Sequence, residues 1–66
     1  MEIDDLLKKL VKPAQRAIEN AGIVSIEQLS TYTEKEVISL HGIGKNAFRI
    51  IKETLHENGL DFSDNP

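Results

Sequence analysis

The short stretch Gly42-Ile43-Gly44 carries the residue types best suited to binding chemistry. Two glycines around one apolar residue allow a sharp reversal of the backbone, with Ile43 filling the space between two helices. Gly44 then becomes the N-cap of the following helix, and it has no side chain to bond the first backbone N–H groups. These N–H groups and the positive end of the helix dipole suit an anion, for which a phosphodiester is the natural candidate.

Basic residues follow this turn. Lys45, Arg49 and Lys52 are spaced by four and three positions, which places them on adjoining faces of one helix. Asn46 lies beside Lys45 in the first turn, and no acid occurs in this helix before Glu53. The pattern favours an anion site. The alternative is a simple tight turn between two helices, with water bound to the exposed N–H groups.

The charges of the chain are segregated along the sequence, although their sum is only −3. Residues 6–18 and residues 37–52 contain bases but no acid, so all eleven acids lie outside these two segments. A polyanion meets one face of a protein, and the negative total therefore does not exclude a nucleic-acid partner. The acidic remainder would equally suit a basic protein partner, and charge runs are often no more than solvated faces.

Length and composition exclude several classes of function. A chain of 66 residues without cysteine has room for one small domain and no thiolate or disulfide chemistry. Its two histidines lack metal-ligand spacing. We therefore expect that the chain is not an enzyme and that it binds no cofactor, metal or small-molecule substrate. Residues 37–44 form the longest uncharged stretch, and residues 1–5 lack the basic start of a signal peptide, so we expect no membrane association and a cytoplasmic location.

Five short helices are predicted to position the candidate residues, and no segment has the alternation of a strand. Apolar spacing and end signals predict helices over 3–10, from Pro13 to a stop at Gly22, a short one from Ile26, one from about Glu34 to 39 or 40, and one over 45–58. Capping boxes are predicted at Ser25 with Gln28 and at Thr33 with Glu36. Ala47, Phe48, Ile51 and Leu55 should be buried, and residues 61–66 should form a loose tail.

The string Leu-His-Gly-Ile-Gly-Lys-Asn-Ala at 40–47 resembles a helix-hairpin-helix motif. Residues 13–62 as a whole resemble the C-terminal domain of the bacterial RNA polymerase alpha subunit. The shared landmarks are Gly22-Ile23, Thr33-Glu34-x-Glu36, the glycine turn and Asn58-Gly59-Leu60. The resemblance implies a compact, SAM-like helical fold that docks on the DNA backbone across the minor groove. It would use the glycine turn, the start of the last helix and the start of the helix at Pro13.

The residue-by-residue comparison with that family is partial. Gly44 and Asn46 match positions at which the family contacts phosphate, and Lys45 lies beside them. Pro13 takes the place of the family's principal minor-groove arginine and cannot serve as one, whereas Arg16, one turn further along, could reach a similar place. We expect the chain to stand without the large amino-terminal assembly domain of an alpha subunit. The resemblance therefore implies a free-standing relative that binds the backbone with little sequence preference.

Together these observations predict a single domain over residues 1–66 that binds double-stranded DNA without catalysis, in a role linked to transcription. A domain of this size makes few phosphate contacts, so its affinity should be near the non-specific range of about 10⁻⁴ to 10⁻⁶ M. The alternative is a protein-interaction module that docks on a larger complex, such as one of transcription. His41 could also reach a phosphate, although a histidine at a helix end is more often structural. The candidate contacts are Arg16, Gly42, Ile43, Gly44, Lys45, Asn46 and Arg49.

Overall fold

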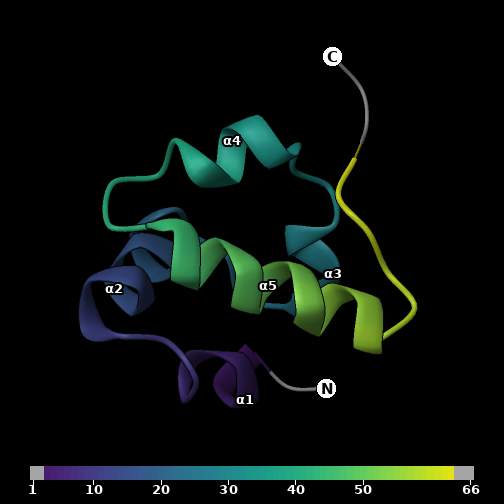
Figure 1. The fold of residues 1–66 in the computed structure, drawn as a ribbon, viewed down its shortest axis with the longest axis horizontal. Helices are drawn as coiled ribbons and strands as arrows, with labels where there is room; N and C mark the ends of the chain where they lie inside the picture. Colours follow the sequence, from purple (N-terminus) through teal and green to yellow (C-terminus); the bar gives the residue numbers. More distant parts are fainter. Residues whose placement is uncertain (1–2, 64–66) are drawn as a thin grey trace.

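The computed structural model describes residues 3–63, which form five helices and no strand (Figure 1). The helices are α1 (Ile3–Leu7), α2 (Lys12–Asn20), α3 (Ile26–Leu29), α4 (Glu34–Ile38) and α5 (Lys45–Glu57). Their Cα radius of gyration is 10.4 Å, close to the roughly 11 Å expected of a compact chain of this length. The predicted all-helical, compact class is confirmed. Within the described range, no helix is long and apolar enough to cross a membrane.

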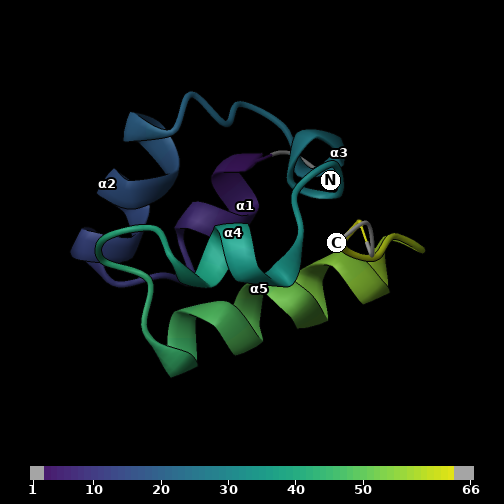
Figure 2. The ribbon, with the colours of Figure 1, turned by 90° about the horizontal axis from the view of Figure 1, so that it is seen from above.

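The longest helix, α5, runs along one edge of the molecule, and the other four helices lie together on one side of α5 (Figure 2). It contacts α1 and α4. Ile51 and Leu55 are fully buried on its inner face, and Ala47 is 6% exposed. Phe48, which the sequence also placed in the core, is only half-buried. The core unites apolar residues of all five helices and of the segments between and after them: Leu6, Leu10, Ala14, Ala17, Ile18, Ile23, Ile26, Leu29, Val37, Ile43, Ala47, Ile51, Leu55 and Phe62.

The starts of α3 and α4 are held by side-chain caps. Thr33 Oγ1 accepts a hydrogen bond from Glu36 N (3.1 Å), and Glu36 Oε1 accepts one from Thr33 N (2.8 Å), which is the predicted capping box. Ser25 Oγ likewise accepts from Gln28 N (3.0 Å). Gln28 Oε1, however, accepts from Val24 N (2.9 Å), one residue before the N-cap. The local sequence therefore determines both helix starts, with a small variation at α3.

The first two helices differ from the predicted ranges at their shared boundary. The prediction for 3–10 was too long, because α1 ends at Leu7. Gln15 Nε2 donates to Leu7 O (2.7 Å) and to Leu10 O (3.0 Å), so a side chain of α2 bonds backbone carbonyls at the end of α1. The second helix starts at Lys12, one residue before Pro13. The predicted start at Pro13 and the observed start at Lys12 both place the proline in the first turn of the helix, where its missing N–H would have no partner.

The C-terminal segment contradicts the expected loose tail over the residues that the structure describes. Phe62 is 5% exposed and stacks on Phe48, with ring centroids 5.4 Å apart and ring planes 6° from parallel. Ser63 N donates to Tyr32 O (2.8 Å). The segment is ordered because Phe62 covers the outer side of the half-buried Phe48. Residues 64–66 of the expected tail lie outside the described residues.

Candidate nucleic-acid interface

The turn between α4 and α5, residues 39–44, packs directly on the first turn of α2. Gly42 has a φ of +104°, and a Cβ at this position would lie 2.5 Å from Pro13 O and 3.5 Å from the Ala17 Cβ. Both the backbone conformation and the lack of space therefore require glycine. Ile43, the next residue, is only 7% exposed, and its N–H donates to Leu40 O (3.1 Å). Ile43 thus packs in the core, and little of its side chain is available to a ligand.

The start of α5 is uncapped. Gly44 is its N-cap, with φ −95° and ψ −174°, and supplies no side-chain hydrogen bond. The first helical hydrogen bond joins Phe48 N to Gly44 O (2.9 Å). The N–H groups of Lys45, Asn46 and Ala47 have no hydrogen-bond acceptor among residues 3–63. They are available for an anion at the positive end of the helix dipole.

The start of α2, which the family resemblance had placed in the DNA-contacting surface, has the same uncapped character. Val11 is its N-cap and offers no side-chain acceptor, and its first turn contains no acid. The sequence indicates this lack of a cap, because Val11, the residue directly before Lys12, is not Ser, Thr, Asp or Asn. By contrast, α1, α3 and α4 each carry an acid in their first turn. Among residues 3–63, α2 and α5 are thus the two helices whose starts have neither a side-chain cap nor an acid. The contact between Gly42 and Pro13 brings these two starts together.

We call this meeting point the α2–α5 junction and define it as residues 12–14 together with residues 42–46. Figure 1 shows the starts of α2 and α5 at the same end of the molecule. Lys12, Lys45 and Asn46 are exposed there. Two dipole ends and two ammonium groups thus gather in one place, and no residue of the junction is acidic. This arrangement can hold the oxygens of a phosphate by backbone N–H groups and charge.

The row of bases predicted on α5 is shorter than its spacing indicated. Arg49 is exposed, one turn after Lys45, and no described acid lies within ion-pair distance of either residue. Lys52 Nζ, however, lies 3.3 Å from Glu34 Oε2 of α4. Its charge is therefore directed toward α4 and is partly neutralised. Two of the three bases remain beside the junction.

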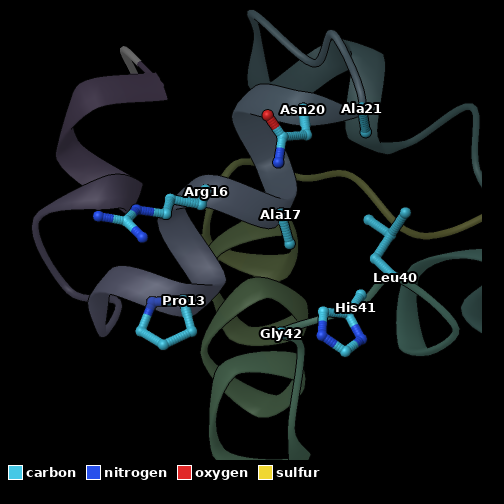
Figure 3. A pocket seen from close by; sticks show the side chains of 8 residues that line it. All are labelled: Pro13, Arg16, Ala17, Asn20, Ala21, Leu40, His41 and Gly42. Atoms are coloured by element: carbon cyan, nitrogen blue, oxygen red, sulfur yellow. The ribbon is translucent and has the colours of Figure 1, made fainter.

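The last predicted contact, Arg16, borders the junction on α2. It is exposed, and Figure 3 shows its guanidinium extending to the side of α2 that faces away from His41. An open depression of about 450 Å³ lies between α2 and the turn before α5. The depression is lined by Pro13, Arg16, Ala17, Asn20, Ala21, Leu40, His41 and Gly42. The structure thus places Gly42, Gly44, Lys45, Asn46 and Arg49 along the turn and the start of α5, whereas the Arg16 guanidinium extends to the other side of α2 and the side chain of Ile43 is buried.

Across residues 3–63, no three His, Asp or Glu side chains come together in a way that could hold a metal ion. The groups that do converge are amide N–H donors, ammonium groups and one guanidinium. Such groups bind oxyanions by hydrogen bonds and charge.

Comparison with known proteins finds similarity over part of the chain. A stretch of 48 residues is 35% identical to the DNA-directed RNA polymerase subunit alpha of Aster yellows witches'-broom phytoplasma (strain AYWB). The same identity over the same length is found with that subunit of Onion yellows phytoplasma (strain OY-M). The stretch covers 73% of this chain but only 14% of each relative. No protein-family model matches the chain. No solved structure matches it either.

Proposed function

We propose that this chain is a non-enzymatic module that binds double-stranded DNA, mainly through the phosphate backbone. In this proposal α4, the turn and α5 act as a helix-hairpin-helix, and Arg16 of α2 adds a contact beside it. The observation that carries the proposal is the α2–α5 junction, where two uncapped and acid-free helix starts meet. Exposed Lys45 and Arg49 extend the positive surface along α5. Successive phosphates of a DNA strand would bind to the junction and to these side chains.

The two alpha subunits support a place in transcription, because their names describe parts of a DNA-directed RNA polymerase. We infer that the similar stretch corresponds to the C-terminal domain of that subunit. Gly44 and Asn46 take part in the proposed contacts through the first turn of α5. Pro13 supplies no charge, so we expect little discrimination between base sequences. Direct base recognition needs side chains that bond base edges, whereas the junction offers mainly backbone N–H groups and ammonium groups.

A second candidate is a protein-interaction module that docks on a larger complex. The relatives are subunits of an assembly, which favours this alternative. Three large apolar side chains are also exposed: Val11 by 68%, Val24 by 74% and Ile38 by 47%. They belong to different parts of the chain, and single exposed apolar residues are common on protein surfaces. The junction therefore favours DNA over protein as the first partner to test.

A titration of a fluorescently labelled duplex with the whole chain tests this function. We expect binding at low salt that weakens steeply as salt increases, because each neutralised phosphate contributes a slope of about −0.9 to log K against log salt. The few contacts at the junction predict a total slope of about −2 to −4. Two duplexes of unrelated sequence should bind with nearly equal affinity. No binding at low salt would contradict the proposal and leave protein docking as the better function.

A further inference from the structure

The depression between α2 and the α4–α5 turn contains a histidine that the contacts proposed above do not use. His41 is exposed and directly precedes Gly42, the residue that packs on Pro13. In Figure 3 its imidazole lies on the side of the depression opposite Arg16, with α2 between them. Pro13 and Gly42 of the α2–α5 junction also line this depression, so a DNA strand bound at the junction would lie close to its mouth. His41 is therefore positioned to contact a phosphate beside those bound by the junction.

The charged groups around His41 do not supply a competing partner. The side chains that α2 contributes to the depression include Arg16 and the neutral Asn20, and the end of the α4 segment contributes Leu40. Lys45 begins α5 just after the turn. No carboxylate lines the depression, and no described acid pairs with His41. An anion that binds here thus meets only positive or neutral side chains.

We propose that His41 is an additional phosphate contact and that its protonated form strengthens duplex binding. This inference rests on the proposed DNA-binding function. Histidine is the side chain whose charge changes most readily between pH 5 and pH 8, and an imidazolium donates two hydrogen bonds where neutral imidazole donates one. A nearby phosphate favours the charged form. Binding therefore takes up a proton, and affinity rises as the pH falls.

The chain offers a matched control in its second histidine, His56. This residue lies in the last turn of α5, and its Nε2 is 3.4 Å from Asp61 Oδ1. A hydrogen bond from Phe62 N (2.8 Å) lowers the pKa of Asp61, and the hydrogen bond and charge of His56 lower it further. His56 thus already has an anionic partner, at the opposite end of α5 from the junction. Its replacement should not alter the pH dependence of DNA binding.

The experiment is a duplex titration at about pH 6 and pH 8, at low salt, with the parent chain, His41→Gln and His56→Gln. We expect the parent and His56→Gln to bind about three- to fivefold more tightly at pH 6, as for one exposed ionic contact, and His41→Gln to show little change. Melting curves at both pH values confirm that each variant is folded.

The outcomes separate this inference from the function on which it rests. Duplex binding that is independent of pH in the parent, or that responds equally in His41→Gln, would overturn the role of His41 while leaving DNA binding intact. Absence of duplex binding at either pH would instead overturn the proposed function, and the role of His41 with it. A pH response that is lost only in His56→Gln would also contradict the assignment.

Discussion

Replacing Gly42 with alanine should strongly destabilise the fold. The new Cβ would lie 2.5 Å from the backbone oxygen of Pro13, and the φ of +104° is unfavourable for any residue with a side chain. Strained backbone of this kind costs roughly 1 to 3 kcal/mol, and the collision with a backbone atom adds to it. We expect a loss of at least about 2 kcal/mol, which lowers the melting temperature of so small a domain by about 8 °C or more. Thermal unfolding followed by circular dichroism measures the change.

The second glycine of the turn supplies the control. Gly44 has a φ of −95°, and a Cβ there would meet nothing within 4 Å. Alanine is a poorer N-cap than glycine, but it also reduces the entropy of the unfolded chain, so Gly44→Ala should change stability by less than about 0.5 kcal/mol. Equal melting temperatures for both variants would show that the turn does not pack on α2 as described.

Charge reversal at Lys45 should move stability and DNA binding in opposite directions. A carboxylate at this position interacts favourably with the positive end of the α5 dipole, so Lys45→Glu should hold the melting temperature or stabilise the fold by about 0.3 to 1 kcal/mol. The same carboxylate repels phosphate. We expect duplex affinity at low salt to fall by about tenfold or more. The slope of log K against log salt should become shallower by about 0.9, which is the contribution of one phosphate contact.

Lys35→Glu is the matched charge control, because Lys35 is an exposed lysine of α4 outside the junction. It changes the net charge of the chain by the same amount and should reduce duplex affinity much less. Arg49→Glu should weaken binding as Lys45→Glu does, since Arg49 lies one turn further along α5. If Lys45→Glu and Arg49→Glu both bind duplex as tightly as the parent, the junction is not the DNA-contacting surface.

The parts of the fold that local sequence determines were predictable. The capping box of Thr33 and Glu36 joins residues three positions apart, and it forms as expected. The bond from Leu60 N to Leu55 O (2.8 Å), which closes the end of α5 after Glu57, follows from Gly59 in the same way. Such signals lie within a few residues of the helix end that they determine. They predict where helices begin and stop without reference to the rest of the chain.

Contacts between distant segments explain what was missed. Gln15 of α2 bonds the carbonyls of Leu7 and Leu10 at the end of α1, and Phe62 of the C-terminal segment stacks on Phe48. Neither interaction follows from a fixed spacing of residues along the sequence. The sequence gives residue types in these cases, whereas the partners depend on how the helices pack.

The candidate site shows the same division between local and distant information. The uncapped start of α5 at Gly44 was predicted from neighbouring residues. The pairing of Lys52 with Glu34 removed one of the expected bases, and it depends on the packing of α4 against α5. A role for the start of α2 was expected only from the family resemblance, because the contact between Gly42 and Pro13 joins residues far apart in sequence. Their contact joins two separate helix starts into one positive surface.

Amide chemical shifts of ¹⁵N-labelled protein, recorded as duplex DNA is added at low salt, test the central claim most directly. The free N–H groups of Lys45, Asn46 and Ala47 should shift most, together with amides at the start of α2. Phosphate bound at these groups changes their hydrogen bonding, whereas amides inside helices keep their partners. Amides of α3, which lies outside the junction and has a capped start, should stay nearly unchanged. Shifts confined to α3 or to the C-terminal segment, or no shifts at all, would contradict a DNA-binding site at the α2–α5 junction.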